Sequence, residues 1–459
     1  MGRAERPAVA NKTRKPGGAT PCPQDEGDLP CYKSAGLHGV GLMDRRHLLK
    51  NSLALGGVLG MSGCAATPQP APAPAPTQTV STTPLMDRPP MLAPVRAHAD
   101  RFFDFKVCLR PFRTKGPNLD VEQIGDAMVV HNYGHGGSGW SLSWGSAEMA
   151  VQKALSRGTK EVAVIGSGII GLTSAITAQR AGAQVTIYTR ELLARTRSVR
   201  ANGSWTPDSR IALTSEAPSN FGDTWEQMAR ISWKNFRPYI GMAGNPIAFA
   251  DHYYLTDAPR GTPQPVDASV PPLPPPSWTG GPTSGEDFAK YSDRIKDITS
   301  HPQQLTPDIN PFPVKYASRS TNMFFNFTEY GHLLTTEFFA RGGKIVMRDF
   351  HSPSELAHLP QKVVINCPGY AAHDWWKDKA MVPVRGQTGW LIPQPEVNYG
   401  LTYRNVQILS KSDGIMVIAL ENGELKGYNN SDESVNRAES ERAVKVIEDL
   451  FARFPVKPA

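Results

Sequence analysis

The chain has 459 residues, with 49 Lys and Arg against 42 Asp and Glu and a formal net charge of +7. This length allows two or three domains and a sizeable core. Residues 1–63 carry most of the excess positive charge and no basic stripe follows them, so we expect no nucleic-acid binding. Two cysteines follow Cys64, namely Cys108 and Cys367, which predicts neither a disulfide framework nor a metal site.

Residues 43–64, MDRRHLLKNSLALGGVLGMSGC, begin with two adjacent arginines, continue through a short apolar run and end at Cys64. The run is too short to span a bilayer. The segment resembles a twin-arginine export signal joined to a lipoprotein cleavage site, in which Cys64 would be lipidated. We therefore expect a periplasmic protein that reaches the membrane only through a lipid anchor. The alternative is a cytosolic helix that follows two chance arginines.

This interpretation makes Met43 the expected start and leaves residues 1–42 as a leader of unknown status. Residues 65–97 are rich in proline and alanine, which is typical of an extended tether. Folded domains are expected after this tether. The predicted division is a nucleotide-binding domain at 98–211 and 329–385, and a substrate domain at 212–328 and 386–459.

Two glycine-rich segments lie close together near the start of the folded part. The first, HNYGHGGSGWSLSWG (131–145), follows a predicted strand that contains CLRPFR (108–113), and a predicted helix continues from it. Its glycines would leave the backbone open to a flat ligand, near the positive end of that helix. The alternative is a glycine-rich core turn before a buried helix.

The second segment, GSGIIG (166–171), lies in a predicted strand–helix–strand unit over residues 161–191. In this motif Gly166 permits the bend, Gly168 lets the backbone approach a pyrophosphate, and Gly171 lets the helix lie close to the strand. The helix start, with Ile169 and Ile170, favours the phosphate charge. The unit ends at Arg190 and Glu191, either of which could hold an adenosine ribose.

Further elements follow this unit. A helix is predicted over 329–341, and strands over KIVMRDF and KVVINCPG should extend the same sheet. Residues 212–328 change character and contain the helical DTWEQMARISWKNF and a proline-rich loop at 271–276. The C-terminal part holds strands in GQTGWLIP and GIMVIAL and an amphipathic helix over 440–454.

Four of these segments, CLRPFR, HNYGHGGSGWSLSWG, RSVRANGSWTP (197–207) and VVINCPG, resemble blocks of the D-amino-acid oxidases and their glycine oxidase relatives. The resemblance implies an α/β fold with a Rossmann-like FAD-binding domain and a substrate domain built on an antiparallel or mixed sheet. It implies FAD as the cofactor, a small amino acid or amine as the substrate, and oxygen or another compound as the electron acceptor.

The resemblance also implies site residues. Arg110 would bind the substrate α-carboxylate, and the carbonyl of Gly137 would accept a hydrogen bond from the amine. The remaining positions implied to contact FAD, beyond those of GSGIIG and the pair Arg190 and Glu191, are Thr196, Arg197, Ser198, Gly203, Ser204, Phe350, Gly369, His135, Gly136, Gly139, Trp140 and Ser141. Family members place tyrosines over the substrate, where this chain offers Asn322, Phe324 and Asn326; Tyr253, Tyr254 or Tyr330 are the possible substitutes.

The order of the blocks differs from that of the family. In the family the GxGxxG unit opens the chain, and the arginine strand and HNYGHGG helix close it, whereas here the closing blocks come first. The sequence therefore predicts a circular permutation, with residues 98–157 moved ahead of the nucleotide turn. The expected activity is oxidation of the CH–NH2 group of a D-amino acid to an imine and then a 2-oxo acid. The alternatives are a glycine- or sarcosine-type amine oxidase and a non-catalytic nucleotide-binding lipoprotein.

Overall fold

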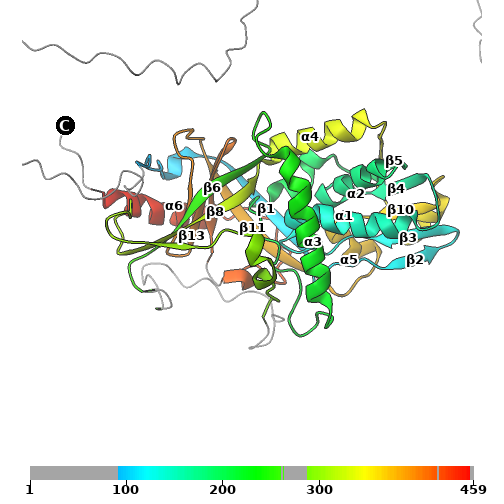
Figure 1. Cartoon of the computed structure of the whole chain (residues 1–459), viewed down its shortest axis with the longest axis horizontal. Helices are drawn as coiled ribbons and strands as arrows, with labels where there is room; N and C mark the ends of the chain where they lie inside the picture. The colour runs from blue at the N-terminus through cyan, green and yellow to red at the C-terminus, as the bar shows by residue number, and fades with distance from the viewer. Residues whose placement is uncertain (1–90, 260–261, 263–286, 421–422, 455–459) are drawn as a thin grey trace, which may run out of the picture. The chain divides into compact units, whose positions relative to one another are not determined.

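The computed structural model describes residues 91–259, 262, 287–420 and 423–454, all within one compact unit, Val80–Ala459 (Figure 1). The segments predicted as a leader, as an export signal ending at Cys64 and as most of the tether lie outside the described residues. Within the described ranges, no helix is long and apolar enough to cross a membrane.

A six-stranded sheet forms the nucleotide-binding part, in the order β2-β3-β10-β4-β5-β9. All neighbours are parallel except β2 and β3. The strands are β2 (Val121–Ile124), β3 (Ala127–His131), β4 (Glu161–Ile165), β5 (Gln184–Thr189), β9 (Lys344–Met347) and β10 (Val363–Asn366). The central strands are buried on both faces, which explains their nearly continuous apolar runs.

Helices α1 (Gly139–Leu155), α2 (Ile169–Arg180) and α4 (Phe327–Ala340) lie beside this sheet, and α3 (Phe221–Phe236) packs on α1 (Figure 1). Helix α2 ends where the sequence predicted, because Gly182 adopts a φ of +91° and its N–H donates to the Gln179 carbonyl. The α1–α3 contact is close at Gly145, where an added Cβ would overlap the backbone of Met228.

The second sheet has eight strands, in the order β1-β11-β14-β13-β12-β6-β8-β7. It is antiparallel apart from the β12–β6 pair. Its strands are β1 (Phe102–Arg113), β6 (Ile247–Thr256), β7 (Gln303–Leu305), β8 (Tyr316–Phe325), β11 (Met381–Leu391), β12 (Gly400–Tyr403), β13 (Val406–Lys411) and β14 (Gly414–Ala419). A small helix, α5 (Ala372–Trp375), precedes β11.

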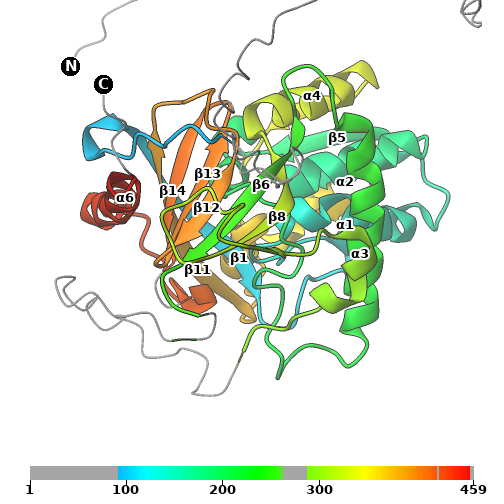
Figure 2. The same ribbon diagram turned by 60° about the vertical axis from the view of Figure 1, so that its left-hand side comes forward.

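Helix α6 (Arg437–Ala452) covers one face of the eight-stranded sheet (Figure 2). It begins three residues before the predicted start, because the Asn436 side chain accepts a hydrogen bond from the N–H of Glu439 and caps it. The α/β fold class and the mixed substrate sheet are confirmed. Strand β1 lies in the eight-stranded sheet, whereas β3, which leads directly into the glycine-rich segment, lies in the six-stranded sheet.

Candidate cofactor and substrate cavity

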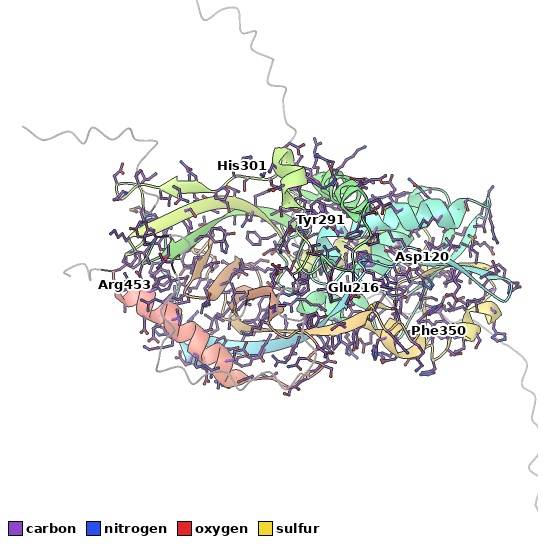
Figure 3. All side chains as sticks on the ribbon, turned by 90° about the horizontal axis from the view of Figure 1, so that it is seen from below. Asp120, Glu216, Tyr291, His301, Phe350 and Arg453 are labelled. Atoms are coloured by element: carbon purple, nitrogen blue, oxygen red, sulfur yellow. The ribbon has the colours of Figure 1, made fainter. Side chains whose placement is uncertain are left out.

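A cavity of about 1040 Å³ lies at the carboxyl ends of β4, β5 and β10 and is also lined by β1, β11 and β14. Crevices at the carboxyl ends of parallel strands are the usual ligand sites of such sheets. Both sheets therefore contribute to one site. Figure 3 labels Phe350, which lines this cavity, toward the end of the molecule that holds the six-stranded sheet.

The glycine turn between β4 and α2 has the geometry that its sequence predicted. Gly166 adopts a φ of +92°, and Gly168 is the N-cap of α2. A Cβ on Gly171 would overlap the carbonyl oxygen of Gly166, so only glycine allows this helix-to-strand approach. The Ile169 N–H donates to Ser198 Oγ (3.1 Å), which joins the turn to the segment after β5. The turn, Ile170 and Ser198 all line the cavity.

One end of the cavity brings together four of the residues predicted to contact the adenosine part of the cofactor. Arg190 and Glu191 follow β5 and pair with each other at 3.6 Å, with both side chains partly exposed. Phe350 stacks on Trp375 with 6.0 Å between ring centroids. Gly369 has a φ of +62°, and an added Cβ there would meet no atom within 4 Å. These predicted residues therefore lie together, with open space in front of Gly369.

Thr196, Arg197 and Ser198 line the middle of the cavity. The guanidinium of Arg197 forms an ion pair with Glu433, which also pairs with Arg200 at 3.4 Å. A phosphate at this point would therefore share Arg197 with a carboxylate.

The first glycine-rich segment reaches the opposite end. The Gly136 N–H donates to the Pro111 carbonyl (2.9 Å) and the Gly137 N–H to the Ser209 carbonyl (3.0 Å). Gly139 lines the cavity, and a Cβ on it would meet no atom within 4 Å. The segment is thus fixed by backbone bonds and presents an open backbone surface at Gly139.

In this segment, the Trp140 side chain already donates its hydrogen bond within the protein, and the His135 side chain carries no charge. The Trp140 indole N–H donates to the Ser198 carbonyl (2.8 Å) and its ring stacks on Phe327 at 4.5 Å. Burial lowers the pKa of His135 to about 3, so its imidazole is neutral at physiological pH. Both residues line the cavity, but the Trp140 N–H is not available to a ligand in this structure.

Three predicted cofactor residues do not line the cavity. Ser141 is buried in α1, and its hydroxyl accepts a hydrogen bond from the Thr206 N–H (2.8 Å). The Gly203 carbonyl accepts from the Phe325 N–H (2.7 Å), and Ser204 forms a bridge with Phe324. Gly203 and Ser204 thus pair with β8, between the cavity-lining residues Asn202 and Thr206.

Arg110 lies on β1 and lines the cavity. Its Nη1 donates to the backbone carbonyls of Val384 (3.4 Å) and Arg385 (3.1 Å), and no carboxylate pairs with it in the described part of the chain. Burial lowers the pKa of the guanidinium. Gly386 makes room for it, since a Cβ there would lie 2.5 Å from both terminal nitrogens.

None of the tyrosines considered as substitutes for the family's tyrosines lines the cavity. Tyr253 packs on Phe312 and Tyr399 in the core, Tyr330 accepts from the Trp144 indole N–H (2.8 Å), and Tyr254 is exposed to solvent. Asn322, Phe324 and Asn326 are also outside the lining.

The structure adds a residue that sequence reasoning missed. Arg210 lines the cavity, with a φ of +50° that is uncommon outside glycine. It follows no recognisable motif, and its position depends on a contact with Gly136, far away in sequence. No sequence signal marked it.

A family model for FAD-dependent oxidoreductases, designated DAO, matches residues 161–458. The chain belongs to this family. The cofactor is therefore FAD, and the resemblance seen in the sequence is confirmed. The cavity fits this cofactor, because the glycine turn, the charged middle and the open surfaces at Gly139 and Gly369 line one continuous space.

Relatives match over short stretches. A D-amino-acid oxidase of Rubrobacter xylanophilus is 45% identical over 60 residues, 13% of this chain and 18% of the relative. A D-aspartate oxidase of Cryptococcus neoformans var. grubii is 54% identical over 37 residues, 8% of each chain. Among solved structures, glycine oxidase from Geobacillus kaustophilus is similar with a TM-score of 0.43 and 13% identity, over 64% of this chain and 80% of that chain. The sequence alignments thus span less than a fifth of these two relatives.

Proposed function

We propose that the chain oxidises the CH–NH2 group of a small amino acid, in the first instance a D-amino acid, to an imine that water hydrolyses to the 2-oxo acid. The observation that carries this proposal is Arg110, a half-buried side chain whose guanidinium lines the FAD cavity and pairs with no carboxylate of the described residues. A guanidinium fork holds a carboxylate through two parallel hydrogen bonds, which fixes the orientation of the substrate Cα.

Each part of the chain has a limited task in this reaction. FAD, when bound, takes up the hydrogen that leaves the substrate Cα as a hydride. Arg110 holds the carboxylate, and the carbonyl of Gly137 accepts a hydrogen bond from the neutral amine, whose nitrogen loses a proton as the imine forms. Positioning of this kind lowers the barrier without a side-chain base. The electrons then pass to oxygen or another acceptor.

A glycine- or sarcosine-type oxidase is the second candidate. It is favoured by the placement of Tyr253, Tyr254 and Tyr330, none of which lines the cavity. Without an aromatic side chain from those positions to cover a larger substrate, a very small amine would lose the least contact area. Arg110 would serve both candidates.

Product analysis tests the proposal. The purified chain is incubated in air with both enantiomers of alanine, with glycine and with sarcosine, and the 2-oxo acid and released amine are quantified. We expect 2-oxo acid from at least one of these substrates, and an Arg110→Lys variant with a raised KM because an ammonium cannot form the bidentate contact. An absence of 2-oxo acid from every compound would refute the proposal.

We also propose that the protein is exported by the twin-arginine route and lipidated at Cys64, which places it in the periplasm. The support is the sequence of residues 43–64. Mass spectrometry of the mature N-terminus tests this: we expect a diacylated Cys64 and its loss in a Cys64→Ser variant. An unprocessed N-terminus that retains residues 43–63 would refute it.

We further infer that the block order arises from circular permutation. The family match begins at residue 161, after the arginine strand. Helix α6 packs in one apolar cluster with Val95 and Ala97, and His98 contacts Glu448 at 3.2 Å, so the C-terminal helix lies beside the start of β1. A chain that begins at residue 159 and carries residues 92–157 after residue 454 should fold and bind FAD as the parent does. Failure of that chain to fold would count against the inference.

A further inference from the structure

Residues 430–436, which we call the strap, form part of the cavity wall. They precede α6 and adopt no helix or strand. Asn430, Glu433 and Asn436 line the cavity, and each of residues 431–436 is also exposed to solvent. The strap therefore separates the cavity from solvent over its length.

Side chains of β11 hold the strap on one side of the cavity. Arg385 donates to the carbonyls of Asp432 (2.8 Å) and Ser434 (2.6 Å). The Gln387 side chain donates to the Asn436 carbonyl (2.6 Å) and accepts from the Asn436 N–H (2.7 Å). The strap is thus attached to the larger sheet by a small set of side-chain hydrogen bonds and not by pairing with a strand.

Glu433 attaches the strap to the other side of the cavity. Its carboxylate forms ion pairs with Arg197 and, at 3.4 Å, with Arg200, the two ends of a short helical turn that follows β5. This arginine turn lies beside the glycine turn, because Ser198 Oγ accepts from the Ile169 N–H (3.1 Å). Dinucleotide pyrophosphates bind at such glycine turns. The ion pairs therefore join the two sides of the cavity next to the expected position of the FAD pyrophosphate.

The arginine turn does not depend on Glu433 for its position. Cys108 Sγ donates to the Arg197 carbonyl (3.5 Å), and the Trp140 indole N–H donates to the Ser198 carbonyl (2.8 Å). The side chains of Arg197 and Glu433 are 35% and 37% exposed, and ion pairs as exposed as this one are weak and open readily. Loss of the Glu433 carboxylate should therefore release the strap and leave the arginine turn in place.

We propose that the strap is a gate for the cofactor and that Glu433 is its latch, so that FAD enters and leaves when Glu433 separates from Arg197 and Arg200. A guanidinium has five N–H donors, so Arg197 can hold Glu433 through Nη2 and a phosphate oxygen through another nitrogen. Because protein side chains alone form the latch, it closes the cavity of the apoprotein and of the holoenzyme alike. The proposal requires FAD and is independent of the proposed amino-acid oxidation.

The rates of FAD exchange test the latch. Association is measured by mixing the apoprotein with FAD, and dissociation by the rise in flavin fluorescence after dilution of the holoenzyme. Glu433→Gln should raise both rate constants by about fivefold or more and change Kd by less than about threefold, because an opened latch speeds both directions alike. Glu396→Gln is the matched control: Glu396 is an exposed carboxylate that pairs with Arg96 and does not line the cavity, so both rates should stay unchanged.

Two results with Glu433→Gln would overturn the proposal. Faster association together with slower dissociation would mean that Glu433 only competes with the pyrophosphate for Arg197. Wild-type rates in both directions would mean that the strap does not limit exchange.

A cross-link provides a second test that does not depend on weakening the latch. Glu433→Cys and Arg200→Cys are combined, and the two thiols are joined in the holoenzyme by a short bifunctional maleimide; the native cysteines Cys108 and Cys367 are buried. Release of FAD should be at least about tenfold slower than in the same double variant before cross-linking, because the strap can no longer open. Release at an unchanged rate overturns the proposal.

Discussion

Replacement of Gly139 by alanine should weaken FAD binding without weakening the apoprotein. Gly139 is the first residue of α1, and a Cβ on it would meet no protein atom within 4 Å. The apoprotein therefore accommodates the methyl group without a clash, and its stability should not fall. Because Gly139 lines the cavity, the methyl group would occupy space that FAD requires. Overpacking of this size costs about 1–3 kcal/mol, or roughly 5- to 150-fold in Kd.

Replacement of Gly171 gives the matched comparison. Its Cβ would overlap the carbonyl oxygen of Gly166, a backbone atom that cannot move without opening the turn. Gly171→Ala should therefore lower both the stability of the apoprotein and the affinity for FAD. The two variants thus separate a methyl group placed in the cavity from one placed inside the turn.

Two quantities are measured for each variant, the stability of the apoprotein and the Kd for FAD. Thermal unfolding of the apoprotein reports stability, and fluorescence titration with FAD reports Kd. Gly139→Ala with wild-type FAD affinity would refute the placement of this segment against the cofactor. A loss of apoprotein stability in Gly139→Ala as large as in Gly171→Ala would refute the open space beside Gly139.

Two further substitutions test other parts of the structure. Gly386→Ala should displace the guanidinium of Arg110, since the added Cβ would lie 2.5 Å from both of its terminal nitrogens. The substrate KM should rise by about tenfold while the Kd for FAD stays unchanged. An unchanged KM would contradict this placement. Burial lowers the pKa of Lys411 from 10.5 to about 7. At pH 6 the folded protein therefore carries a buried, charged Lys411, and between pH 7 and pH 10.5 it has released a proton that the unfolded chain still retains. Lys411→Met should therefore raise the free energy of unfolding at pH 6 by on the order of 5 kcal/mol, and this gain should fade between pH 7 and pH 10.5. Denaturant titrations that show the same difference at both ends of this range would contradict the buried charge.

Local patterns account for what the sequence predicted well. The GSGIIG turn, its flanking strands and the glycine end of α2 depend on residues within a short stretch, so periodicity and glycine placement were sufficient. The glycine-rich segment before α1 was predicted in the same way. Arg110 required the resemblance to the oxidases, because an isolated arginine in a strand is usually part of a surface ion pair.

Long-range contacts account for the rest. Gly203 and Ser204 do not line the cavity themselves, because they pair with Phe325 and Phe324 of β8, more than a hundred residues later in the chain. Arg210 reaches the cavity because its backbone rests on Gly136. The position of β1 in the larger sheet follows from its register with β11, which no local pattern encodes.

The most direct test of the proposed chemistry is anaerobic reduction of the bound flavin. The purified holoenzyme is mixed with each candidate amino acid in the absence of oxygen, and the visible absorbance of the flavin is followed. The account predicts complete bleaching by at least one amino acid, and a concentration for half-maximal reduction that is at least about 30-fold higher in Arg110→Ala. Bleaching by no amino acid, or the same concentration dependence in the variant, would contradict the role of this cavity in amino-acid oxidation.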